Sequence, residues 1–163
     1  MPQITIEYMI MIPILIMQIF LFPLTAGWIM TMWVDSRQTL ALQETASHLG
    51  SLIQQVYSAL NHESISAGTV TNRLEVPPFI EGYAYTGNAT LRTTLDPELN
   101  SSKVLDITLR FMGSHIEATT SVTLGANAEW DQNSEFMSNS TYASLIAGKM
   151  SNGTILLYFE GDD

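Results

Sequence analysis

Cysteine is absent from the 163-residue sequence. Disulfide bonds, thiolate nucleophiles and cysteine-based metal sites are therefore excluded. The absence carries no information about the redox state of the compartment in which the protein works.

Positive charge is also scarce. Six Lys and Arg residues stand against 16 Asp and Glu residues, which gives a formal net charge of -10 at pH 7. Such an acidic surface repels phosphate backbones. We therefore expect no nucleic-acid partner.

Residue sets typical of catalysis are missing as well. The three histidines have no metal-ligand spacing on a common face and are expected to be exposed or capping residues: His48, His62 and His115. The Gly-x-Ser-x-Gly motif of serine hydrolases is not present. We expect no enzymatic activity and no cofactor.

One acidic loop surrounds Trp130 with three carboxylates: Glu129, Asp131 and Glu135. Calcium coordination and a solvated acidic loop both fit these residues. Their spacing lacks the regular order of ligands in an EF-hand. We favour the solvated loop and expect no metal site.

The dominant feature that is present is an apolar run from Ile4 to Val34. Its 31 residues include a single charged residue, Glu7. A helix rises about 1.5 Å per residue, so this run is more than long enough to cross the roughly 30 Å hydrocarbon core of a bilayer. A helix that is apolar on all sides must be covered by lipid or by protein, including copies of itself. The sequence leaves both covers open.

Glu7 needs a partner. A carboxylate inside an apolar span costs several kcal/mol unless it is paired or neutralised. The run contains no Lys, Arg or His that could pair with it. The partner must come from a water-exposed interface, from a neighbouring chain or from an α-amino group.

Two prolines, Pro13 and Pro23, interrupt the run. Each removes a backbone donor and crowds the carbonyl one turn earlier, so we expect a kink or a locally unwound turn near each. Gly27 makes the backbone just beyond Pro23 more flexible. These features are either kinks in a membrane anchor or a region of bending in a packed fibre.

The pattern becomes amphipathic from Thr39 to Asn61. Apolar residues recur there at spacings of three and four and share one helical stripe: Leu42, Ala46, Leu49, Ile53, Val56 and Leu60. We therefore predict one helical domain over residues 1–61, apolar over 4–34 and amphipathic over 35–61, on the order of 85 Å long. A lone membrane anchor would not need the second half.

Residues 62–163 form the second predicted domain, and most of it reads as β-strand. Three hairpins are expected around the turns Gly87-Asn88, Gly113-Ser114 and Ser151–Gly153. The predicted strands cover residues 80–86, 89–95, 103–112, 116–124, 141–150 and 154–160, and residues 125–140 read as a polar loop. The predicted fold class is α+β, a long N-terminal helix followed by an antiparallel, immunoglobulin-like β-sandwich head.

Four Asn-x-Ser/Thr sequons lie in the second domain, and their acceptor residues are Asn88, Asn100, Asn139 and Asn152. A single sequon is a weak signal. Four within 65 residues, expected in turns or at strand edges, favour an exported surface with N-linked glycans over polar loop composition.

The apolar run opens with the stretch Gln3-Ile-Thr-Ile-Glu-Tyr-Met-Ile-Met-Ile-Pro13, and the apolar helix, the amphipathic half and a β head follow it. This arrangement resembles the type IV pilin superfamily, especially archaeal and TadE-like pilins. The resemblance implies a prepilin peptidase that trims a leader, and an assembly ATPase with a membrane platform. Counted from Gln3, Glu7 holds the fifth mature position. The resemblance implies that Glu7 pairs there with the N-terminal amine of a neighbouring subunit.

The cysteine pair common in the heads of many bacterial pilins is missing. Together with the sequons, this favours an archaeal surface filament. We expect a structural subunit that lies in the cytoplasmic membrane before assembly and then forms an extracellular, helical homo-polymer through residues 4–60, serving adhesion. The alternative is a monomeric, single-pass membrane protein that displays a β-sandwich binding domain.

Overall fold

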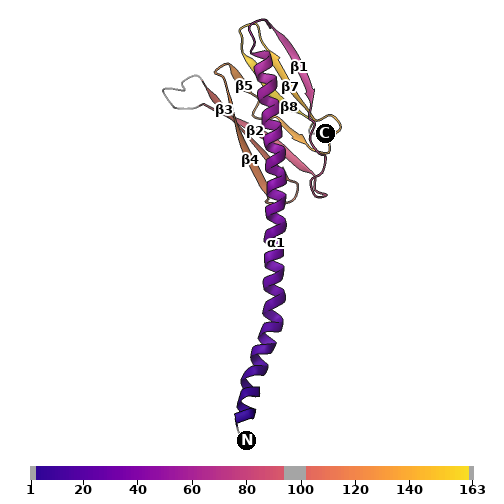
Figure 1. The fold of residues 1–163 in the computed structure, drawn as a ribbon. Helices are drawn as coiled ribbons and strands as arrows, with labels where there is room; N and C mark the ends of the chain where they lie inside the picture. The colour runs from indigo at the N-terminus through magenta and orange to yellow at the C-terminus, as the bar shows by residue number, and fades with distance from the viewer. Residues whose placement is uncertain (1–2, 94–101, 162–163) are drawn as a thin grey trace. The chain divides into compact units, whose positions relative to one another are not determined.

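The computed structural model describes residues 3–93 and 102–161, without the side chains of residues 3–7. Helix α1 (Gln3–Leu60) comes first and the strands follow it (Figure 1). The strands are β1 (Gly68–Arg73), β2 (Tyr85–Thr93), β3 (Lys103–Phe111), β4 (Glu117–Leu124), β5 (Ala128–Trp130), β6 (Glu135–Met137), β7 (Ser144–Lys149) and β8 (Ile155–Glu160). A long N-terminal apolar helix followed by antiparallel sheets confirms the α+β class.

The chain divides into two compact units, Met1–Arg37 and Gln38–Asp163. We refer to them as unit 1 and unit 2. The first part of α1 forms unit 1, and the rest of α1 belongs to unit 2 together with all the strands. The expected division between residues 61 and 62 follows the end of the helix and stays a prediction.

In unit 1, α1 continues as α-helix through both Pro13 and Pro23. Of the two forms expected near each proline, a kink or a locally unwound turn, the helix does not show the unwound turn. Figure 1 shows that the indigo part of α1 bends instead, which is how a helix absorbs the bulk of a proline ring. Thr25 Oγ1 donates to the carbonyls of Leu21 and Phe22, at 3.0 Å in each case.

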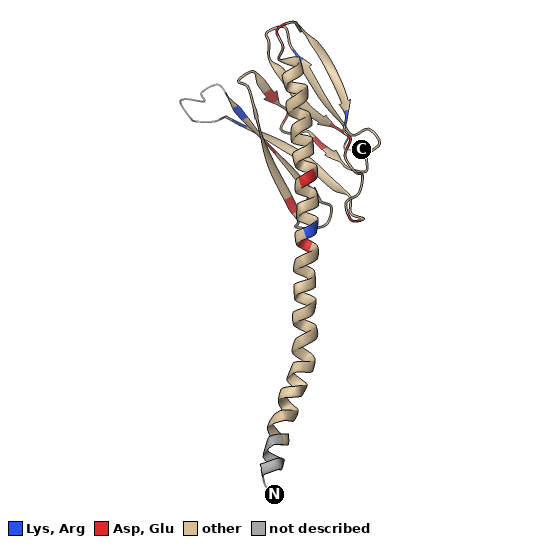
Figure 2. Cartoon of the chain, in the orientation of Figure 1, with Lys and Arg blue, Asp and Glu red and all other residues tan. Residues whose placement is uncertain are grey.

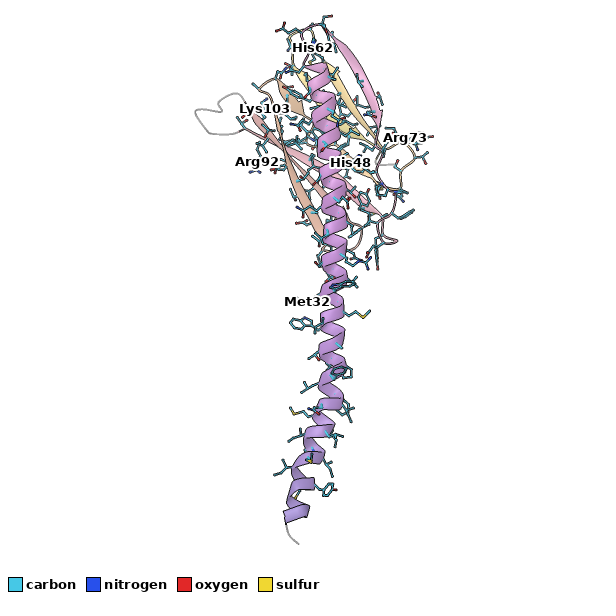
Figure 3. The ribbon with its side chains drawn as sticks, viewed as in Figure 1. Met32, His48, His62, Arg73, Arg92 and Lys103 are labelled. Carbon is cyan, nitrogen blue, oxygen red and sulfur yellow. The ribbon has the colours of Figure 1, made fainter. Side chains whose placement is uncertain are left out.

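The described side chains of α1 in unit 1, from residue 8 to residue 37, are exposed on all sides of the helix. Every large apolar residue described between Tyr8 and Val34 is open to its surroundings. By length and composition α1 is able to cross a membrane, a test that signal sequences and buried core helices also pass. In Figure 3, Met32 stands out from this part of the helix.

Unit 2 contains two four-stranded sheets, with strand orders β1-β7-β8-β5 and β4-β3-β2-β6. The pairs β3–β4 and β7–β8 are antiparallel and confirm the hairpins expected at residues 113–114 and 151–153. One pair, β5–β8, runs parallel. The expectation of a purely antiparallel head is corrected in this one respect.

The second half of α1 is part of the core of unit 2. Its predicted stripe is buried, except for Val56, which is partly buried. The inward faces of both sheets join the same apolar cluster, and the rings of Phe136 on β6 and Phe159 on β8 meet edge to face at 4.9 Å. Alternation of apolar and polar residues along β3 and β4 gives each strand one buried and one solvated face.

A glycine lets the helix approach the sheet closely. A Cβ atom on Gly50 would lie 2.6 Å from Cγ2 of Val122 on β4. Glycine costs helix stability because of its backbone freedom. At position 50, the absence of a Cβ atom allows α1 to pack directly against β4.

The expected turn at Gly87-Asn88 is wrong, because β2 runs straight through it. Gly87 is glycine for a different reason, since a side chain there would collide with Phe136 and Leu109. The tight turn lies earlier, where Ile80 and Tyr83 exchange backbone hydrogen bonds of 3.0 Å. Its central residues, Glu81 (φ 50°) and Gly82 (φ 86°), both have the positive φ of a type I′ turn.

The predicted polar loop 125–140 contains two short strands, β5 and β6. Trp130 and Phe136 are buried there and hold the segment against the core. The ring of Trp130 meets Phe159 edge to face at 4.9 Å. Each strand has three residues, so its alternation is too short to stand out in a polar stretch, and the buried aromatic residue holds it against the core.

Candidate assembly and glycosylation sites

The residues expected to act in assembly all lie on α1, which is 58 residues long. Glu7 belongs to the helix backbone, and its side chain lies outside the described residues. Pro13 and Pro23 lie within the helix. Gly27 has open space around it, because no atom would come within 4 Å of a Cβ placed there.

Gln18 is a second strongly polar residue of the apolar span, and counting charges alone overlooks it. Its side chain is exposed, and it has no hydrogen bond to any described residue. An amide in hydrocarbon without a partner is costly. A search of the sequence for uncharged polar residues within the apolar run is the signal that finds it.

The C-terminal end of the apolar span carries an aromatic–cation pair. The guanidinium of Arg37 lies 5.5 Å from the ring centre of Trp33, which is 65% exposed. In Figure 2 the first red and blue positions on the coloured part of α1 lie beyond the long tan stretch. Trp and Arg side chains together are typical of the boundary between an apolar layer and water.

Three of the four sequons lie among the described residues, and each of their acceptor asparagines is exposed. Asn139 and Asn152 lie in connections between strands, as expected, and the Oδ1 atom of Asn152 accepts the backbone N–H of Thr154 at 3.0 Å. Asn88 lies in the middle of β2, so its expected position in a turn is wrong. Asn100 lies outside the described residues.

The surroundings of Asn88 are polar. It pairs with Thr108 on β3 and with Glu135 on β6, and the Oγ1 atoms of Thr108 and Thr119 are 3.0 Å apart. Residues two apart on a strand share a face, so the sequon threonine, Thr90, is exposed on the same side. The acceptor Asn88 and the sequon threonine are thus both open to solvent on this sheet face.

An ion pair lies on the same sheet face. Arg92 on β2 donates to Asp106 on β3, and Ser121 Oγ donates to the other carboxylate oxygen at 2.6 Å. The hydrogen bond from Arg92, followed by that from Ser121, lowers the pKa of Asp106 below its ordinary value. The Arg92 side chain is 66% exposed, against 15% for Asp106, so solvent screens the pair and it stabilises the sheet only slightly.

Tyr85 has the largest pKa change among the described residues of unit 2, and its role is structural. Its hydroxyl donates to the carbonyl of Pro77 at 2.7 Å, and its backbone N–H donates to Ser138 Oγ at 2.9 Å. Burial raises the pKa of the Tyr85 hydroxyl well above its ordinary value. The residue fixes the segment 77–78 to the core.

The histidines and the acidic loop stay separate. His62 Nδ1 lies 2.8 Å from Ser64 Oγ, and Figure 3 shows His48 and His62 at different levels of the helix end. Asp131 Oδ1 accepts the backbone N–H of Asn133 at 3.0 Å. Within residues 8–93 and 102–161, no group of three or more His, Asp or Glu side chains is placed to hold a metal ion.

Comparison with known proteins returned no matching family model, no matching curated protein and no matching solved structure.

Proposed function

We propose that this chain is the structural subunit of a filament and that it polymerises through the first part of α1. The observation that carries the proposal is the contrast within one helix. From Tyr8 to Val34 its large apolar side chains are exposed, whereas from Leu42 to Leu60 its apolar stripe is buried in unit 2. A long uncovered apolar surface on a chain that also has a folded, polar unit marks an interaction surface.

Copies of the same chain are the cover that we propose for this surface. Contacts that repeat without closing produce an open filament. Lipid tails are already apolar, so leaving the bilayer gains little from the hydrophobic effect. Packing between helices, and a partner for Glu7, must then favour the assembled state.

The finer identification rests on residues 3–13. We propose an archaeal type IV pilin-like subunit, trimmed by a prepilin peptidase and driven from the cytoplasmic membrane by an assembly ATPase and its platform. Unit 2 would be the extracellular head, comparable to immunoglobulin-like sandwiches. Adhesion is the proposed task of the filament, by analogy with the family alone.

Electron microscopy of material sheared from cells that produce the chain tests the proposal. We expect filaments that bind an antibody against unit 2. Glu7→Ala and Glu7→Lys should reduce filament yield sharply while the chain remains in the membrane, because the incoming subunit loses its ionic partner. Glu44→Ala, at an exposed glutamate of α1 in unit 2, is the matched control.

Two outcomes would count against different parts of the proposal. Normal filaments from both Glu7 variants would remove the role given to Glu7. Wild-type chains found only as dispersed, detergent-soluble monomers would remove the filament itself. That result would support the alternative, a single-pass anchor with a binding domain, which the length and composition of α1 also fit.

Glycosylation is a separate part of the proposal. We expect N-linked glycans on at least two of the four sequon asparagines. The exposure of Asn88, Asn139 and Asn152 supports this. Bare peptides at all four positions in mass spectra of surface material would contradict it.

A further inference from the structure

Gln18 and Pro23 leave two hydrogen-bonding groups without partners in the apolar span. Gln18 has no hydrogen bond to any described residue, although its amide is both a donor and an acceptor. Pro23 has no N–H, so the carbonyl of Ile19, four residues earlier, lacks its helical donor. Thr25 donates to the carbonyls of Leu21 and Phe22 and not to that of Ile19.

Both groups border one side of α1. Two adjoining grooves of about 650 Å³ and 550 Å³ follow this side and share Phe22 and Thr25. Spacings of three and four place the groove residues on one face, which we call the Leu15–Trp33 face: Leu15, Gln18, Phe22, Thr25, Ile29 and Trp33. Thr25 is a small residue between larger ones, which lets another helix approach closely.

A second copy of the chain matches this face chemically. Hydrocarbon offers neither a donor nor an acceptor, and a backbone carbonyl left unpaired in it costs several kcal/mol. The donor that the Ile19 carbonyl lacks is the group that Gln18 carries. A second copy of the chain therefore supplies the missing partner in one direction, as contacts in an open filament do, whereas lipid satisfies neither group.

We propose that the Leu15–Trp33 face is the contact between copies of this chain, with Gln18 Nε2 of one copy donating to the Ile19 carbonyl of the next. The proposal deepens the filament function, because it names the side of the helix through which subunits meet. The contact between two copies does not depend on the filament function; only its repetition along a filament does. Association of two helices in a bilayer tests the face directly.

Photo-crosslinking of the full chain in lipid vesicles provides the first test. A photoreactive phenylalanine analogue is placed at Phe22, on the face, or at Phe20 as the matched control. Both are exposed, at 76% and 68%, and two residues along a helix place them on nearly opposite sides. We expect dimers from position 22, attached within residues 15–33 of the second copy, and mainly lipid adducts from position 20. Dimers absent at position 22, or equally abundant at position 20, would overturn the proposal.

Substitutions of the two polar groups provide the second test. Gln18→Leu should lower the dimer association constant about tenfold, the effect of one hydrogen bond between helices in a membrane. Gln18→Asn keeps an amide and should recover part of the loss. Pro23→Ala gives the Ile19 carbonyl its own helical donor and should cost about as much as Gln18→Leu. The double variant should be no weaker than either single variant, because both remove the same bond. Unchanged association of Gln18→Leu would reject the hydrogen bond.

Failure of the face and failure of the filament function are separable. Filaments seen by microscopy together with crosslinks through position 20 would reject the Leu15–Trp33 face and keep the function. Dimers through position 22 in vesicles, with no filaments on cells, would support the face and reject the function.

Discussion

The two parts of α1 have the same backbone and opposite surroundings. From Tyr8 to Val34 in unit 1, the large apolar side chains are exposed on every side of the helix, and none of these described residues is buried. In unit 2, the stripe from Leu42 to Leu60 is buried, and polar residues occupy the other side. The periodicity of apolar residues, not helix propensity, separates the part that the chain covers itself from the part that needs another cover.

The largest expected difference between the two parts concerns leucine truncation. Leu49 is fully buried and Leu21 is exposed. Leu49→Ala should lower the free energy of unfolding of unit 2 by about 3 kcal/mol, through lost burial and a residual cavity. Leu21→Ala, the matched control, should leave it unchanged.

The measurement is denaturation of the full chain in detergent micelles, followed by tryptophan fluorescence. The sequence has three tryptophans, so Trp28→Phe with Trp33→Phe leaves buried Trp130 as the sole reporter of unit 2. An equal loss from Leu21→Ala would show that the exposed part of α1 supports the fold of unit 2, and the contrast between the two parts would fail.

Glycine replacement gives a smaller effect and sharpens the same comparison. Gly50→Ala gains about 1 kcal/mol of helix propensity but places a methyl group against Val122, an overlap that costs about 2 kcal/mol. We expect a net loss of about 1 kcal/mol in the stability of unit 2. Gly27→Ala should cause no loss, because open space surrounds that position.

A double variant checks the cause assigned to the Gly50 effect. Val122→Ala removes the methyl group that a side chain at position 50 would meet. In combination with Gly50→Ala it should recover part of the loss, which a double-mutant cycle with the same fluorescence readout measures. Strict additivity of the two changes would contradict a direct contact.

The smallest expected effect lies on the solvated sheet face. Because hydrogen bonds lower the pKa of Asp106 in the folded state, its ionised form stabilises unit 2 above the ordinary aspartate pKa of about 3.9. That contribution is lost as the pH falls through the folded-state pKa. Asp106→Asn should therefore cost about 0.5 kcal/mol at neutral pH and nothing in strong acid. Unfolding curves at pH 7 and at acidic pH measure the difference, and a cost that does not change with pH would contradict the ionic origin.

Much of the fold follows from sequence pattern because the pattern is regular. The stripe at Leu42, Leu49 and Ile53 and the alternation along β3 and β4 each repeat often enough to define a face. The turn at residues 113–114 follows from the glycine between two alternating runs. In each case local chemistry and tertiary packing favour the same conformation.

The errors arise where one residue type serves two purposes. Gly87 looks like a turn residue, but it is required for close packing against Phe136 in mid-strand. The short strands β5 and β6 depend on distant partners that local pattern does not contain. Gln18 is overlooked because counting charges alone passes over an uncharged amide in the apolar run.

The absence of a side chain at Gly50 also influences the position of α1 along its own axis relative to β4. Sliding α1 by one turn would bring Ala46 or Gln54 to the position beside Val122, and either residue carries the Cβ atom for which there is no room. Tension applied along the axis of α1 would therefore meet steric resistance before the helix could slip past β4. The absent methyl group thus biases the helix toward one position along β4, because a slide by one turn adds an overlap beside Val122 that costs about 2 kcal/mol.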